Sequence, residues 1–284
     1  MKTAIYLRVG ASRSASAGFS RTDLFALLCT ASLLVLLLFT SGASSATRSR
    51  LAVCLNNHKQ LSRAWLGYAE DNGGKLVGNL DGGNVSILSN SNLTWVLGWL
   101  DFSTRNGENT NTLFLTKYSP LAPYLGHSSA PFQCPADFSK SEARSNLRHV
   151  RSVSMNGYLG SQFSWTSGYR LYRSTSDVTD PAPSRTFVFI DEREDSINGG
   201  MFQMDMSGYD PQNPSAYRLV DFPADWHDRS ANLSFADGHA ETWRWRDPRT
   251  RPGHKSGQSL SLAVSSPNNV DVARLHEVTS RRIK

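Results

Sequence analysis

The sequence is poor in cysteine, carries little net charge and lacks the short motifs that identify common hydrolases. Its 284 residues include three cysteines, Cys29, Cys54 and Cys134, and no two of them have the C-x-x-C spacing of a recognisable zinc site. The formal net charge is +6, and four of the basic residues precede the first acidic residue, Asp23. Such a mild positive surplus argues against nucleic acid as a partner.

Internal repeats and activated nucleophiles are also missing. No G-x-S-x-G motif marks a serine as activated, so a Ser-His-Asp hydrolase has no support in the sequence. No repeat with a period of about 20 to 50 residues is apparent. With 39% hydrophobic residues, the chain is long enough for one sizeable globular domain and an appendage.

The longest apolar segment lies near the amino terminus and follows a basic leader. It covers the seventeen residues Leu24 to Thr40, which would reach about 26 Å as a helix, against a hydrocarbon core of about 30 Å. This segment indicates membrane targeting. Its length leaves open whether it is a retained transmembrane span or a signal peptide that is removed.

A second helical pattern continues the apolar segment. Apolar and aromatic residues recur at steps of one, three and four, which is the stripe of an amphipathic helix; they are Leu51, Cys54, Leu55, His58, Leu61, Trp65 and Tyr68. The pattern predicts one helix from Thr22 to Asn72, which Gly73 and Gly74 would end.

The rest of the chain predicts a loop-rich head that contains β-strands. The clearest strand is "SRTFVFIDE" at 184–192, which is rich in β-branched and aromatic residues. An acidic run follows it, and its spacing fails the EF-hand pattern, so a solvated turn is the simpler interpretation and a calcium site the alternative. The candidate calcium ligands are Asp191, Glu192, Glu194 and Asp195. A short helix is expected to begin near Asn269, with Val272, Leu275 and Val278 on one side.

The stretch "NLSFADGHAETWRW" predicts a β-hairpin. A three-residue turn, Ala236-Asp237-Gly238, pairs Phe235 with His239 and Leu233 with Glu241, and it places the apolar residues of both strands on one face. Gly238 is needed in this turn because only glycine adopts a positive φ without steric cost.

Two further sites are suggested by residue types alone. Cys54, on the predicted helix, and Cys134, in "FQCP", are expected to lie close enough for a disulfide, with two buried free thiols as the alternative. His227, Asp237 and His239 are residue types that bind metals or transfer protons. Their spacing matches no known metal motif, so a structural role for the hairpin is favoured over a metal-dependent hydrolase.

Taken together, these segments resemble the type IV prepilins and type II secretion pseudopilins. The similarity runs from Gly18-Phe19, through an acidic residue at Asp23 and "CLNNHKQLSRAWLGYAEDNGGKLVGN", to an H-x9-D-G motif formed by His227, Asp237 and Gly238. It is closest to the group from planctomycete and verrucomicrobial bacteria that carries this motif. The segments "RSVSMNGYLG" and "TFVFIDEREDSINGGMF" also match that group.

The resemblance implies an α+β protein in which a long amino-terminal helix, transmembrane and then amphipathic, packs on a β-rich, pilin-like head. The implied segments are a leader peptide (1–18), a transmembrane part of the helix (19–46), its amphipathic continuation (47–75) and the head (76–284). A prepilin peptidase would cut between Gly18 and Phe19, and Asp23 would take the place of the family's glutamate in assembly.

The implied function is that of a structural subunit without catalytic activity or a required cofactor. Its partners would be the prepilin peptidase, other pilin-like subunits and the inner-membrane platform of a type II secretion or type IV pilus-like assembly. The protein would be a single-pass inner-membrane protein with its head in the periplasm or outside the cell.

Two alternatives remain open. In the first, Arg21 and Asp23 only close the basic region of an ordinary signal peptide that is cut near "ASSA". In the second, the protein is an anchored or secreted binding module that uses exposed aromatic side chains as carbohydrate platforms. The candidate platforms are Trp95, Trp99, Trp165 and Trp226.

Overall fold

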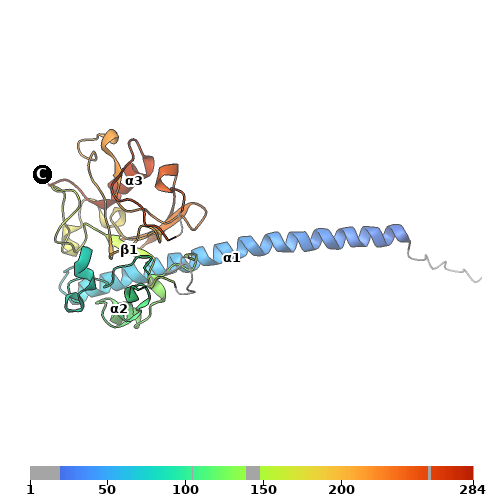
Figure 1. Cartoon of the computed structure of the whole chain (residues 1–284), viewed down its shortest axis with the longest axis horizontal. Coiled ribbons are helices and arrows are strands. Elements are labelled where there is room, and N and C mark those ends of the chain that lie inside the picture. The colour runs from blue at the N-terminus through green and yellow to red at the C-terminus, as the bar shows by residue number, and fades with distance from the viewer. Residues whose placement is uncertain (1–19, 104, 139–147, 255–256, 284) are drawn as a thin grey trace, which may run out of the picture. The chain divides into compact units, whose positions relative to one another are not determined.

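The computed structural model describes residues 20–103, 105–138, 148–254 and 257–283, with the side chains of 34–46 left aside. The chain divides into two compact units, 1–46 and 47–284. One helix, α1 (Arg21–Asp71), contributes to both units (Figure 1). The predicted helix from Thr22 to Asn72 is therefore confirmed to within one residue at each end.

The prediction of a transmembrane segment is wrong. In the described part of the chain, no helix combines the length and the apolar character that crossing a membrane requires. This finding contradicts the transmembrane assignment of 19–46 and the single-pass inner-membrane location. The physical reason is the short apolar run, which Asp23 bounds on one side and the small, polar segment "SGASS" on the other.

The second unit, which we call the head, is α+β. Its main sheet has the order β3-β1-β2-β5-β6, and β1 pairs with β3 in parallel while the other neighbours are antiparallel. The strands are β1 (Val153–Asn156), β2 (Phe187–Asp191), β3 (Met201–Phe202), β5 (Ser230–Phe235) and β6 (Ala240–Arg244). A second sheet joins β4 (Arg218–Leu219) to β7 (Val264–Ser265).

Long loops and short helical turns connect these strands. The described part of the head also contains the α-helices α2 (Leu113–Thr116) and α3 (Val270–Thr279). The Asn269 side chain caps α3 by accepting from the amides of Asp271 and Val272. Val272, Leu275 and Val278 are buried along one side of α3, as the sequence predicts.

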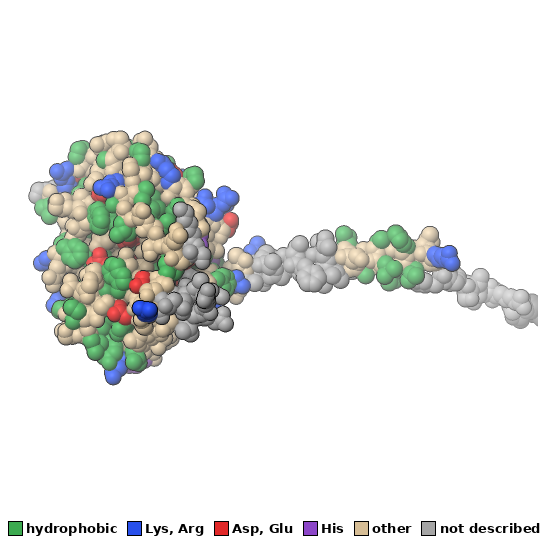
Figure 2. Space-filling view, in the orientation of Figure 1, with side chains coloured by type: hydrophobic (Ala, Val, Ile, Leu, Met, Phe, Trp, Pro, Cys, Tyr) green, Lys and Arg blue, Asp and Glu red, His purple; other side chains and the backbone are tan. Residues whose placement is uncertain are grey.

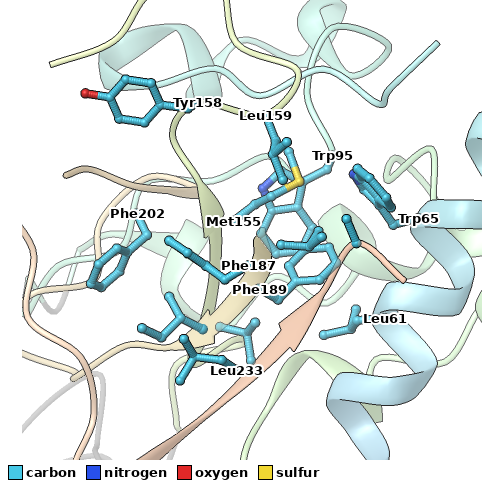
Figure 3. Close-up of a cluster of buried hydrophobic side chains, with 14 of the residues drawn as sticks. Leu61, Trp65, Trp95, Met155, Tyr158, Leu159, Phe187, Phe189, Phe202 and Leu233 are labelled. Atoms are coloured by element: carbon cyan, nitrogen blue, oxygen red, sulfur yellow. The ribbon is translucent and has the colours of Figure 1, made fainter. Parts of the chain in front are cut away.

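The carboxyl-terminal part of α1 forms part of the hydrophobic core. Leu61 and Trp65 are almost fully buried, and Figure 3 shows both side chains directed from α1 toward Trp95 and Phe189. The Trp95 ring lies edge-on to Phe189, with centroids 5.0 Å apart. Trp95 itself belongs to a segment without regular secondary structure, so the core contains a buried loop as well as the sheet.

The predicted hairpin register is confirmed. Leu233 pairs with Glu241, and the Phe235 amide donates to the His239 carbonyl at 2.9 Å. Gly238 has a φ of +91°, as the three-residue turn requires. The turn also contacts α1, because the Ser62 hydroxyl donates to the Gly238 carbonyl.

Replacing Gly238 by valine is expected to destabilise the head by roughly 1 to 3 kcal/mol, because a β-branched residue is strained at positive φ. Steric overlap adds little, since an added Cβ would meet only Leu66 Cδ1, at 3.5 Å. Gly83→Val is the matched control, because Gly83 has open space around it and its φ is not positive. Urea unfolding of both variants measures the difference. Equal losses of stability would show that the turn conformation at Gly238 is not responsible.

Candidate functional site

Four buried side chains from four separate segments of the head meet at one point. They are Cys54 of α1, Cys134 of a loop, Asp191 at the end of β2 and His227, which precedes β5. One sulfur, nitrogen or oxygen atom from each lies within 4.8 Å of the others. Their exposed fractions lie between 0% and 5%. We call these four residues the Cys-Asp-His cluster.

The local structure explains why α1 and β2 contribute to this cluster. Cys54 and His58 lie one helical turn apart and therefore share the face of α1 that packs on the sheet. β2 is buried along its whole length, so its last residue, Asp191, is carried into the interior. A buried carboxylate is costly unless it is paired and hydrogen-bonded.

Asp191 has several partners. Its Oδ1 lies 2.9 Å from His58 Nε2, and its Oδ2 accepts from the backbone and side-chain N–H groups of Asn232, at 2.9 and 3.0 Å. Cys54 Sγ lies 3.7 and 3.6 Å from the two carboxylate oxygens. Asp191 therefore connects α1, β2 and β5 through hydrogen bonds.

Cys134 and His227 form the other half of the cluster. Their Sγ and Nε2 atoms lie 3.1 Å apart, and the Ala136 amide donates to Cys134 Sγ at 3.4 Å. Burial raises the pKa of Cys134, but hydrogen bonds with Cys54 and His227 outweigh it, so its pKa lies below the ordinary value. Burial and Asp191 raise the pKa of Cys54. Cys134 is thus the first of the two thiols to ionise.

The arrangement offers two sulfur atoms, one imidazole nitrogen and one carboxylate oxygen in a space closed to solvent. Such a set can bind a transition metal, and the two thiols could alternatively be oxidised to a disulfide. A reaction on an external substrate would need access to these atoms, and their burial provides none. The geometry therefore suits a structural role.

The structure brings together some of the residues singled out in the sequence and separates others. Cys54 and Cys134 are neighbours in the cluster, and both are free thiols. His227 joins them, whereas Asp237 and His239 pair with each other at the hairpin turn, partly exposed. Among the described residues, His227, Asp237 and His239 form no common metal-binding group. The geometry thus gives no support to a hydrolase built on these three.

The candidate calcium ligands also have separate partners. Asp191 belongs to the Cys-Asp-His cluster, and Glu192 accepts from the Ser196 hydroxyl at 2.7 Å. Glu194 Oε1 lies 2.8 Å from His254 Nε2, and Asp195 forms a bidentate ion pair with Arg193. No three of these four carboxylates converge on one point in the described structure.

The candidate residues for assembly lie in the amino-terminal unit. Gly18 and Phe19 lie outside the described residues, so cleavage between them stays a prediction. Asp23 is exposed and accepts from the amide and the hydroxyl of Ser20, at 2.9 and 2.7 Å. These hydrogen bonds lower the pKa of Asp23 and satisfy a donor at the start of α1.

The four candidate carbohydrate platforms differ in exposure. Trp95 is fully buried, Trp99 and Trp226 are partly buried, and Trp165 is exposed at 43%. Among the four, Trp165 is therefore the most accessible candidate platform for the binding-module alternative.

Comparisons with known proteins identify no relative. No protein-family model, curated protein or solved structure matches this chain. The resemblance to prepilins therefore stays a prediction from the motifs.

Sequence reasoning missed Asp191, His58 and Asn232 as members of one network. The signal for Asp191 was its place at the end of an uninterrupted apolar strand, which a sheet buried on both faces would carry into the core. The sequence holds no comparable signal for His58 or Asn232, because their contacts with Asp191 depend on how α1 and β5 pack beside β2.

The raised pKa of the buried Glu192 carboxyl makes the stability of the head depend on pH. Burial raises its pKa to about 7 from an ordinary value of 4.5, and Ser154, Ser196 and Arg151 oppose this only in part. The folded state therefore holds this proton between pH 4.5 and about 7, where the unfolded chain releases it. Stability should fall as pH rises through this window, by up to about 1.4 kcal/mol per pH unit.

Glu192→Gln should make the fall in stability between pH 4.5 and 7 shallower, because the amide does not ionise. Asp221 is unchanged in the variant, and burial raises its pKa as well, so part of the fall remains. His149 and His276, whose pKa values burial lowers, contribute equally to both proteins. Urea unfolding at several pH values measures the difference. Identical pH profiles for the two proteins would contradict this account of Glu192.

Proposed function

We propose that the protein is a pilin-like structural subunit whose first helix associates with the same helix in other copies of the chain. The motifs favour a type II secretion or type IV pilus-like assembly. What supports association is the amino-terminal part of α1. Five large apolar side chains there are between 51% and 71% exposed; they are Leu24, Phe25, Leu27, Leu28 and Leu33.

These five side chains lie close together in the chain, on the first turns of α1. Figure 2 shows hydrophobic side chains gathered on the described first turns of α1, next to a basic residue (Figure 2). Exposed apolar surface that is contiguous marks a site of association rather than free surface. We call the five residues the α1 apolar surface.

The free energy available from burying this surface is comparable with the cost of association. Burying a leucine or phenylalanine side chain contributes about 1.5 to 3 kcal/mol, so five of them approach or exceed the estimated cost of about 4 to 15 kcal/mol for immobilising two molecules. A bundle of several helices would bury more of the apolar surface of each copy than a pair of helices would. An assembly of several copies is therefore favoured over a simple pair.

Asp23 supports the same proposal. It is exposed at the start of α1, and its partner in the chain is the neighbouring Ser20. If a prepilin peptidase cuts between Gly18 and Phe19, the new amino group of one copy can pair with Asp23 of another. That pairing would set the stagger of the helices, while the α1 apolar surface supplies the free energy.

The double substitution Leu24→Asp and Leu28→Asp is expected to weaken self-association by about 100-fold or more, because both residues lie on one face and each aspartate would be buried without a partner. Ile87→Asp with Leu88→Asp is the matched control, since these head residues are 47% and 50% exposed. Sedimentation velocity over a range of concentrations measures association. A wild-type chain that stays monomeric, or a control that weakens association equally, would contradict the proposal.

A further inference from the structure

We propose that the Cys-Asp-His cluster binds one zinc ion, with Cys54, Cys134, Asp191 and His227 as its four ligands. Zinc in structural sites takes four ligands in a tetrahedron, and cysteine, histidine and aspartate are the side chains that supply them. The spacing along the chain matches no zinc-binding motif, because the four ligands come from α1, a loop, β2 and the segment before β5.

The donor atoms lie near the distances of a tetrahedral zinc site, and shifts of a few tenths of an ångström up to about one ångström would complete it. With zinc–sulfur bonds of about 2.3 Å and zinc–nitrogen or zinc–oxygen bonds of about 2.0 to 2.1 Å, the edges of the tetrahedron measure roughly 3.3 to 3.8 Å. Cys54 Sγ lies 3.6 Å from Asp191 Oδ2 and 3.7 Å from Oδ1. Cys134 Sγ lies 3.1 Å from His227 Nε2, and no pair exceeds 4.8 Å.

Hydrogen bonds from neighbouring groups hold two of the four proposed ligands, Asp191 and Cys134. His58 and Asn232 hold the Asp191 carboxylate in place and leave a lone pair of Oδ1 for the metal. The Ala136 amide points at Cys134 Sγ, where it would stabilise a thiolate. Such outer hydrogen bonds orient ligands and tune their basicity.

Charge balance also favours a divalent cation. Zinc binding displaces the protons of Cys54 and Cys134, which are released to solvent. Two thiolates, one carboxylate and a neutral imidazole around Zn²⁺ leave a single negative charge. One carboxylate beside two protonated thiols carries the same charge, so exchanging two protons for Zn²⁺ adds no net charge to an interior where an unbalanced charge is costly.

A disulfide would involve only two of the four side chains of the cluster. Joining Cys54 to Cys134 removes two protons and two electrons and therefore needs an external oxidant. It would also leave His227 Nε2 without its hydrogen-bonding partner, because Cys134 would no longer carry a thiol or thiolate. A buried polar atom that loses its partner costs about 1 to 3 kcal/mol. Zinc instead engages all four side chains at once.

All four positions around zinc are filled by the protein, and the cluster is closed to solvent. Closed four-ligand sites stabilise folds, whereas catalytic zinc sites keep one position open. The ion would join α1 to β2 and to the segment before β5 within the head. This inference does not depend on the proposed self-association, because every ligand lies in the head.

Metal analysis of the full chain tests the proposal. The wild-type protein is purified without chelator and dialysed against zinc chloride and then against buffer. It is expected to retain one zinc ion per chain, measured by elemental mass spectrometry. Removing the zinc with a chelator under reducing conditions should lower the melting temperature by about 10 °C. Cobalt chloride added to the metal-free protein should produce the absorption of a cobalt–thiolate bond.

Substitution of the ligands identifies the site. Cys54→Ser, Cys134→Ser and His227→Ala should each lower zinc affinity by about 100-fold or more, measured by competition with a coloured chelator. Cys29→Ser is the matched control, because Cys29 is exposed and lies outside the cluster. It should retain both zinc and the cobalt spectrum.

Two results on the wild-type chain would overturn the inference, and neither depends on whether a variant folds. The first is a reduced protein that retains no zinc and gives no cobalt–thiolate absorption. The second is a protein that, once denatured without reductant, shows one reactive thiol instead of three, because Cys54 and Cys134 are then a disulfide. Zinc retained equally by the three ligand variants would also contradict the assignment.

Discussion

The burial of the Asp191 carboxylate is the constraint on which the rest of the head depends. β2 is buried along its whole length, so the carboxylate of the residue that ends it needs hydrogen-bond partners within the protein. His58 supplies one from α1 and Asn232 supplies two from β5. These hydrogen bonds fix how α1 lies on the sheet, and that position in turn brings Cys54 toward Cys134 and His227.

Local patterns explain which parts of the fold could be predicted from the sequence. The extent of α1 follows from apolar spacing and from Gly73 and Gly74, and the hairpin register follows from alternation and from Gly238; both agree with the structure. The transmembrane prediction is wrong, since no helix in the described residues is both long and apolar enough to cross a membrane.

The candidate site could be predicted only in part, because it depends on contacts between distant segments. The proximity of Cys54 and Cys134 was expected from the helix and one loop. Nothing in the spacing indicated that His227 belongs with them rather than with Asp237, ten residues later in the same motif. The structure divides the H-x9-D-G motif between two tasks: His227 lies in the cluster, and Asp237 accepts from the His239 amide in the turn.

Zinc-edge X-ray absorption of the purified full-length protein tests the central claim, that the Cys-Asp-His cluster holds a metal where α1 meets the sheet. The account predicts two sulfur neighbours at about 2.3 Å and two nitrogen or oxygen neighbours at about 2.0 to 2.1 Å from the zinc. A zinc signal with only nitrogen and oxygen neighbours would place the metal elsewhere on the protein and contradict the account.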